Sequence, residues 1–266
     1  MSVIISIRGP KGSGKSSLAK RLSGTNGWLD LEFGSERAYN EDNGVVDKDE
    51  VWQPLENGLD EVLFEVLTLE KGGQVTRRRD LWEAVVQQYG RFLRDPNIDN
   101  IIVDTAKELW YMNYMFHLQH TQEEAVRTKK RPRQNLQPIE YATPNNRMNA
   151  FVYAARAFHK NLILIAHDRP IYVEKLIDGE LREVPSGEYE LDGYKNTLDL
   201  VDWAFISRVD LKCQKRIDNP SDHECKGYHF YATIEKSPNK INLVGAEIEE
   251  SSARELITPI GEVAIA

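Results

Sequence analysis

One short segment near the N-terminus constrains the fold more than any other. A β-branched run from Val3 to Ile7 is typical of a buried parallel strand, and Leu18 to Leu22 reads as helix. Between them stands G-x-x-x-x-G-K-S, formed by Gly9, Pro10, Lys11, Gly12, Ser13, Gly14, Lys15 and Ser16, with Ser17 next. Glycines let successive N–H groups point inward, and the helix N-terminus adds its positive dipole. An ordinary glycine-rich turn is the alternative, but the strand–turn–helix context favours a phosphate-binding loop (P-loop).

Two side chains of this loop have expected roles toward a nucleotide. Lys15 is placed to reach the β- and γ-phosphates of ATP, and the Ser16 hydroxyl is placed to bind Mg²⁺. The metal also needs a carboxylate, and Asp104 ends the apolar run Ile101 to Val103. Ligands of open α/β sheets bind at the carboxyl ends of the strands, so we expect Asp104 to hold Mg²⁺. The alternative is an Asp that caps the following helix.

Hydrolysis also requires a group that orients or deprotonates water. Glu32 ends the apolar alternation Trp28 to Phe33, again at a carboxyl edge, and is the best general-base candidate. Thr105, and not an acid, follows Asp104, which shifts the catalytic role toward Glu32. A solvated loop charge is the alternative reading of Glu32.

Strands alternate with helices along most of the chain. Further helices are expected at 57–71, 80–94, 108–125 and 146–159, a further buried strand at 162–166, and edge strands at 202–209, 228–234 and 241–248. Residues 36–53, 127–144 and 168–197 look irregular. This order predicts an α/β fold with a doubly wound, mostly parallel sheet and antiparallel edge strands.

Length and composition limit the class of protein. The 266 residues are compatible with a single domain, which we place at 1–250 with a tail at 251–266. Two cysteines exclude a disulfide scaffold, and the apolar runs are too short to span a bilayer. The N-terminus lacks the features of a signal peptide, so we expect a cytoplasmic protein with no membrane partner, in the host cytoplasm if the chain is phage-encoded.

Taken together, these segments resemble the RecA-type ATPase core. The resemblance rests on the P-loop, on Leu29 to Glu32, on Ile102 to Thr105, and on the strand 162–166 that ends in His167. The short length, with Lys236 on a late strand, is most similar to reduced RecA-like ATPases of phages, including recombination and single-strand annealing proteins. Only the P-loop is specific by itself.

The resemblance carries expectations about fold, site and assembly. It implies a RecA-like sheet, Glu32 as the water-activating residue, Asp104 and Thr105 near Mg²⁺, and a γ-phosphate sensor at His167, where RecA has glutamine. It further implies a homo-oligomer, a ring or a filament, in which Lys236 completes the neighbour's ATP site with Lys240 nearby. An ordinary strand-end histidine and a solvated hairpin lysine are the alternatives for His167 and Lys236.

The net charge of −8 argues against a uniformly basic nucleic-acid surface, so a polyanion must meet a local patch. One such patch contains five cations, Arg127, Lys129, Lys130, Arg131 and Arg133. In RecA-type proteins DNA-binding loops follow the strands that end here at Asp104 and His167, which points to residues 127–147 and 168–197. We therefore expect single-stranded DNA as a partner, with a solvated basic face as the alternative. Arg77, Arg78 and Arg79 form a weaker cluster. The acidic C-terminal stretch either competes with DNA for the basic segment or only aids solubility.

Cys213, His223, Cys225 and His229 are suitable zinc ligands, but they lack the paired C-x₂₋₄-C spacing. We expect them instead to flank a hairpin with its tip at 218–220.

The sequence thus favours an Mg²⁺-dependent ATPase that binds single-stranded DNA and assists recombination or annealing. A P-loop kinase of a small molecule, with 127–133 as its lid, and a nucleotide-gated loader or packaging accessory are the alternatives.

Overall fold

The computed structural model describes residues 2–20, 22–32, 49–53, 66–68, 74–76, 79–177, 180–215, 223–238 and 243–249. Within these ranges, residues 66–68, 74–76, 79, 210–215, 223–230 and 249 are described by their backbone only. No helix in the described ranges is both long and apolar enough to cross a membrane.

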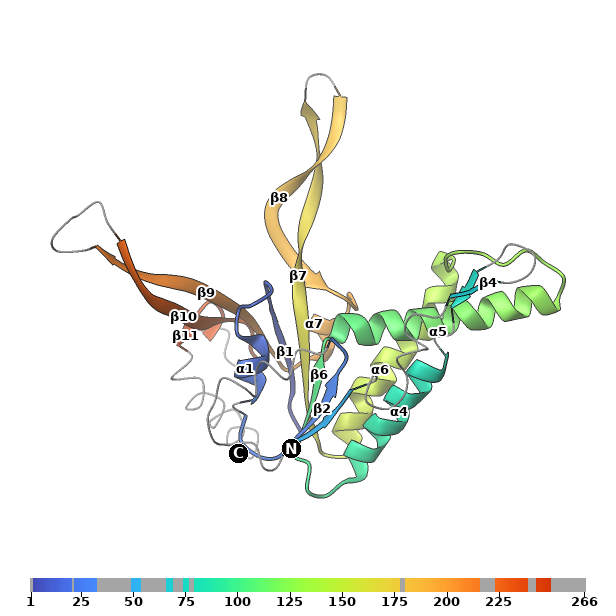
Figure 1. Cartoon of the computed structure of the whole chain (residues 1–266), viewed down its shortest axis with the longest axis horizontal. Helices are drawn as coiled ribbons and strands as arrows, with labels where there is room; N and C mark the ends of the chain where they lie inside the picture. Colours follow the sequence, from blue (N-terminus) through green and yellow to red (C-terminus); the bar gives the residue numbers. More distant parts are fainter. Residues whose placement is uncertain are drawn as a thin grey trace.

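A central sheet organises the described chain (Figure 1). Six neighbouring strands are parallel, in the order β9-β1-β7-β6-β2-β3. Their bounds are β9 Trp203–Lys215, β1 Ile4–Gly9, β7 Asn161–Ile177, β6 Asn100–Asp104, β2 Asn26–Asp30 and β3 Glu50–Trp52. Antiparallel strands β10 (His223–Lys236) and β11 (Glu247–Glu249) extend the β9 edge. The prediction of a mostly parallel α/β sheet with antiparallel edge strands is confirmed.

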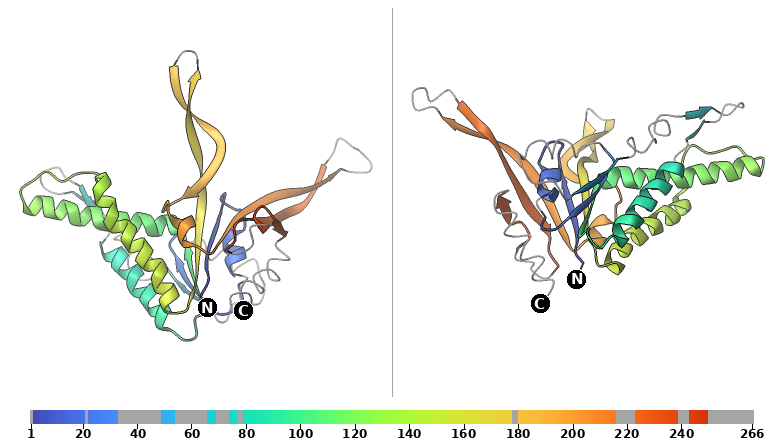
Figure 2. Two further views of the ribbon diagram at one scale, coloured as in Figure 1. Left: turned by 180° about the vertical axis from the view of Figure 1, so that it is seen from behind. Right: turned by 60° about the horizontal axis from the view of Figure 1, so that its bottom comes forward.

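Alternate residues of the buried strands face two separate cores. Ile4, Leu162 and Leu164 pack with helices α4 (Arg79–Arg94), α5 (Ala106–Arg127) and α6 (Ala142–Ala157), whereas Ile5 and Ile163 pack with α1 (Lys15–Lys20). Figure 2 shows the three long helices on one side of the sheet and α1 on the other. Helices thus cover both faces, which explains why the central strands are nearly continuous apolar runs.

Two strands of the sheet continue far beyond it as hairpins (Figure 1). Strand β7 runs ten residues past His167 and pairs with β8 (Glu180–Asp192), and β9 pairs with β10 in a second hairpin. The prediction that residues 168–197 form a loop was wrong. Their polar sequence lacks the burial that marks core strands, because this part of β7 and most of β8 lie on the surface.

Other boundaries differ from the sequence-based expectations. The helix expected at 57–71 is contradicted by strand β4 (Val66–Thr68), which pairs with β5 (Gln74–Thr76); residues 57–65 and 69–71 lie outside the described ranges. Of the late strand expected at 241–248, the described residues 243–249 form a strand over Glu247–Glu249. A short helix, α7 (Thr197–Leu200), and a 3₁₀ turn, η2 (Pro138–Tyr141), complete the described elements. The domain boundary at 250 stays a prediction, since 251–266 lie outside the described chain.

Candidate nucleotide-binding site

The P-loop connects the end of β1 to the start of α1, as its sequence pattern predicts. Gly14 has a φ of 81°, a left-handed conformation that favours glycine. At Gly9 the loop passes so close to β9 that a Cβ atom would overlap the carbonyl oxygen of Ser207. The Ser207 hydroxyl in turn hydrogen-bonds to the carbonyl of Ser13. Strand β9 therefore packs directly against the P-loop and holds it in place through Ser207.

The Lys15 amine lies within this loop. Its Nζ donates to the carbonyl oxygens of Gly9 at 3.1 Å and of Pro10 at 2.7 Å. Burial lowers the pKa of Lys15, while the carboxylates of Asp104, Asp168 and Glu32 act in the opposite direction. A phosphate group brought to the loop offers this amine a charged acceptor in place of two neutral carbonyls.

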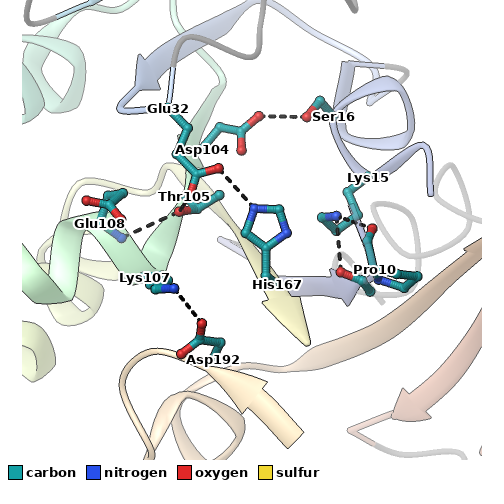
Figure 3. Close-up of polar contacts among 11 residues, drawn as sticks. Pro10, Lys15, Ser16, Glu32, Asp104, Thr105, Lys107, Glu108, His167 and Asp192 are labelled. Carbon is teal, nitrogen blue, oxygen red and sulfur yellow. Dashed lines mark hydrogen bonds and ion pairs between the residues drawn. The ribbon is translucent and has the colours of Figure 1, made fainter. Parts of the chain in front are cut away.

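Ser16 and Asp104, the two expected metal ligands, are in direct contact (Figure 3). The Ser16 hydroxyl donates to Oδ2 of Asp104 at 2.6 Å. Burial raises the pKa of Asp104 to about 6, with Asp30 and Glu32 adding to the shift and Ser16 opposing it. A buried carboxylate near two others and beside a hydroxyl is the oxygen-rich, anionic setting that Mg²⁺ prefers. The residues present therefore fit Mg²⁺, with Ser16 and Asp104 as the groups that would hold it.

Glu32 lies at the same edge of the sheet, oriented by two neighbours (Figure 3). Its Oε1 accepts from the Thr105 hydroxyl at 2.8 Å, and its Oε2 is 2.9 Å from Nε2 of His167. The hydrogen bond from His167, and then that from Thr105, lower the pKa of Glu32. The side chain is thus a fixed carboxylate, ionised at neutral pH.

The strand order explains why these residues meet. Strand β7 lies between β1 and β6, so His167 is in register with Gly9 on one side, while its neighbouring strand β6 ends at Asp104. The backbone N–H groups of Leu31 and Glu32 both donate to the carbonyl of Asp104, at 2.6 Å and 3.2 Å. The carboxyl edge of the sheet thus brings together the P-loop, Asp104, Glu32 and His167, as their strand-end positions predicted.

Sequence reasoning missed a buried ion cluster directly below the loop. Arg8, one residue before Gly9, donates to Asp168 at 2.6 Å and to both carboxylate oxygens of Glu235 at 2.7 Å and 2.8 Å. Although burial opposes its charge, the hydrogen bonds that Arg8 donates to Glu235 and Asp168 raise its pKa. A charged residue within the run Ile4 to Arg8 was the available signal, because a buried charge requires a partner. Arg8 therefore joins the roots of both hairpins to the P-loop strand.

A second ion pair connects the start of α5 to the β7–β8 hairpin. Lys107 Nζ lies 2.7 Å from Oδ2 of Asp192, and this hydrogen bond raises the pKa of Lys107 (Figure 3). Thr105 is the N-cap of α5, with its hydroxyl accepting from the backbone N–H of Glu108 at 3.4 Å. Thr105 therefore both caps the helix and donates to Glu32.

The predicted basic segment is remote from this site. It begins at Arg127, the last residue of α5, whose 22 residues separate it from Asp104 by about 33 Å at 1.5 Å per residue. Arg127 pairs with Glu124 and Arg133 with Glu140. Lys129, Lys130 and Arg131 are exposed and make no ion pair with any described side chain. The DNA-binding role of the five cations stays a prediction.

Lys236, the expected trans-acting cation, is engaged within its own chain. Its amine donates to the carbonyls of Leu198 and Val201 at the end of α7, the latter at 2.7 Å. A role at a neighbour's nucleotide requires release from these carbonyls and stays a prediction. Lys240 lies outside the described residues.

The remaining sequence candidates lie partly or wholly outside the described chain. Cys213 and Cys225 are register partners on the β9–β10 hairpin, but the side chains of the four residues weighed as zinc ligands are not among those that the structure describes. Among the described residues no group of three His, Cys, Asp or Glu side chains could hold a metal. Arg77 and Arg78, the side chain of Arg79 and the tail beyond 249 also lie outside the described chain.

Comparison with known proteins agrees with this geometry. The family model of an AAA domain matches residues 1–201, which include the P-loop, Glu32, Asp104 and His167. No curated protein matches the chain. Because the family model covers most of the sequence, and the site combines a P-loop with two strand-end carboxylates, the chain belongs to the AAA-domain family of P-loop ATPases.

Proposed function

We propose that this protein is an Mg²⁺-dependent ATPase that acts as a homo-oligomer and binds single-stranded DNA in recombination or strand annealing. The observation that carries the proposal is the fixed Glu32 carboxylate, held by Thr105 and His167 at the sheet edge that also holds the P-loop. Family membership supports ATP hydrolysis. The DNA-binding part rests on the RecA resemblance and on the exposed cations after α5.

The chain's own residues divide the work of hydrolysis. Lys15 exchanges the carbonyls of Gly9 and Pro10 for phosphate oxygens, and the P-loop N–H groups orient the phosphates. Glu32 positions a water molecule and accepts its proton. His167 is the candidate sensor, because it links Glu32 to the strand beside the P-loop. Ser16 and Asp104 would hold Mg²⁺, which would offset the charge that develops on the phosphates.

Glu32→Gln tests the catalytic assignment. General-base catalysis contributes about 10²- to 10⁴-fold, so we expect turnover to fall by that factor while ATP binding persists. Glu108→Gln is the matched control, because Glu108 lies near Thr105 on α5 and has no assigned role in hydrolysis. Equal turnover in Glu32→Gln and the wild type would remove Glu32 from the mechanism.

Single-stranded DNA tests the partner assignment. We expect DNA to stimulate ATP hydrolysis, with binding that weakens steeply as salt rises. The double variant Lys129→Glu/Lys130→Glu should lose this binding, whereas Arg94→Glu/Lys195→Glu, with two exposed cations elsewhere, should retain it. Hydrolysis that ignores DNA would contradict the proposal. Phosphorylation of a small acceptor would identify a kinase, although the 33 Å length of α5 (about 1.5 Å per residue) leaves residues 127–133 far from the phosphates as a lid within one chain.

A further inference from the structure

The outer part of the β7–β8 arm, which comprises residues 168–177 and 180–192, has two uncovered faces. Figures 1 and 2 show it as a twisted ribbon that projects from the sheet away from the helices. From Glu174 to the tip, every described side chain on β7 is exposed, and Leu176 and Leu181 are 71% and 69% exposed. A two-stranded ribbon is marginally stable in water without a packing partner. The arm therefore has the character of one half of an interface.

The register of the two strands divides the side chains between the faces. Residues directly opposite in an antiparallel pair share a face, and successive residues alternate. One face, here called the acidic face, carries the opposed pairs Tyr172 and Pro185, Glu174 and Glu183, and Leu176 and Leu181. The other, here called the basic face, carries Val173 and Val184, Lys175 and Arg182, and Ile177 and Glu180.

Each face places two like charges directly opposite one another. Glu174 opposes Glu183, and Lys175 opposes Arg182, an arrangement that destabilises an isolated hairpin. Arg182 has one partner, the exposed Glu180 at 3.1 Å. Glu174, Glu183 and Lys175 make no ion pair with any side chain in the described part of the protein. Apart from the pair between Arg182 and Glu180, the like pairs thus have no compensating charge among the described side chains, and an opposite charge from outside would make them favourable.

The two faces complement each other. The carboxylate pair and the cation pair differ by one residue along the strand, a shift of about 3.3 Å. When the acidic face of one arm lies on the basic face of another in the same direction, the opposed glutamates meet Lys175 and Arg182. The pair Tyr172 and Pro185 then meets Val173 and Val184, and Leu176 meets Ile177, whereas Leu181 meets Glu180. Contacts between two identical faces instead bring like charges together, which is unfavourable.

We propose that the β7–β8 arm is the contact between copies of this chain, with the acidic face of one copy on the basic face of the next. Such an interface is heterologous, so repeated association gives a closed ring or an open filament and not a twofold dimer. The inference rests on the homo-oligomer in the proposed function, and on neither ATP hydrolysis nor DNA binding.

The overall charge of the arm argues against a nucleic-acid partner for the same surface. Residues 168–192 contain eight Asp or Glu and three Lys or Arg. A surface of this sign repels a phosphate backbone. Because Arg8 and Lys107 tie the root of the arm to the P-loop strand and to α5, its direction relative to the nucleotide site is fixed. Neighbouring copies stacked through their arms would therefore keep a constant orientation.

Charge reversal on one face at a time tests the inference. The variants Glu174→Lys/Glu183→Lys and Lys175→Glu/Arg182→Glu each give two faces of one sign. Because like charges at an interface cost several kcal/mol, we expect self-association of each variant to weaken by at least about a hundredfold, measured by analytical ultracentrifugation. An equimolar mixture of the two variants should assemble again, since each then offers the face the other lacks.

Matched controls separate assembly from folding and from function. Glu83→Lys/Glu123→Lys reverses two exposed carboxylates on α4 and α5 and should assemble as the wild type does. Circular dichroism and ATP binding should be unchanged in all three variants, because the reversed residues are remote from the P-loop. Wild-type protein that stays monomeric, single-face variants that assemble normally, or a mixture that fails to assemble would each overturn the inference. Loss of ATPase or DNA binding in an assembled protein would overturn the proposed function alone.

Discussion

The carboxyl edge of the sheet and the β7–β8 arm use charge in opposite ways. At the edge, Arg8 lies between Asp168 and Glu235, and Glu32 is bonded to His167. On the arm, Glu174 opposes Glu183 and no counter-charge is supplied from within the described chain. Compensated charges hold a site together, whereas uncompensated like charges indicate a surface that is completed by another molecule. Four substitutions test this contrast, from the largest expected effect to the smallest.

Arg8→Met should have the largest effect on stability. It leaves Asp168 and Glu235 without their common partner, and breaking a buried pair in this way costs about 3–5 kcal/mol of unfolding free energy. Arg169→Ala is the matched control on the arm, because its pair with Glu190 is 39% and 48% exposed and is worth at most about 1 kcal/mol. Urea denaturation measures both. Similar losses of unfolding free energy in the two variants would show that ion pairs at the sheet edge and on the arm contribute equally to stability.

Asp104→Asn should stabilise the metal-free protein at neutral pH. The folded pKa of about 6 lies above the unfolded value of about 3.9, so the wild type loses stability as pH rises from 4 to 6. Two pKa units correspond to about 3 kcal/mol, which is the expected gain at pH 7 and which disappears below pH 4. Thermal unfolding in EDTA measures it, with exposed Asp199→Asn as the control. A stability difference between Asp104→Asn and the wild type that does not change with pH would show that the raised pKa of Asp104 is not its cause.

Lys236→Met tests whether the amine stabilises its own chain. Removal of the donor leaves the carbonyls of Leu198 and Val201 unpaired, at an expected cost of about 1–3 kcal/mol of unfolding free energy. Lys195→Met, an exposed lysine near α7, is the control. ATP turnover at protein concentrations that permit assembly gives a second measurement. A drop in turnover without a loss of stability would favour the trans-acting role. Lys236 would then not belong to the charged groups that stabilise the sheet edge of its own chain.

Glu174→Lys alone should have the smallest effect, and a stabilising one. It replaces a like pair by an opposite pair across the ribbon, worth about 0.2–1 kcal/mol. Slower amide hydrogen exchange along β7 and β8 in dilute, monomeric protein measures it. Glu188→Lys, an exposed change on β8 outside the opposed Glu pair, should leave the exchange rates unchanged. Faster exchange in Glu174→Lys would show that the like pair does not destabilise the arm.

The parallel core was predictable because a strand buried on both faces must be apolar throughout. Ile101 to Val103 and 162–166 have this property, and each ends at a polar residue that the structure brings to the nucleotide site. This rule located Asp104 and His167, whereas the P-loop was found by its glycine-rich motif and Glu32 by an alternating segment. The contacts of these residues did not follow from the sequence, because the hydrogen bonds of Glu32 depend on which strands are neighbours.

The hairpins escaped prediction for the opposite reason. Residues 168–192 bury almost no side chains, so their sequence carries no burial pattern and looks like a loop. Arg8 escaped because its two partners are 160 and 227 residues away along the chain. Sequence periodicity indicates which side chains of a segment face a hydrophobic core. Ion pairs between distant segments and a ribbon without a core produce no such periodicity.

The central position of β1 has a consequence for folding during synthesis. Its neighbours are β7 and β9, and the backbone N–H of Ile4 donates to Asp202, 198 residues later. At 5–20 residues per second, about 10–40 s of synthesis separate these two residues. The strand that carries the P-loop is therefore synthesised long before β7 and β9, the two strands between which it lies. Contacts of such long range form slowly, so during translation the unpaired β1 is exposed to chaperones and to aggregation.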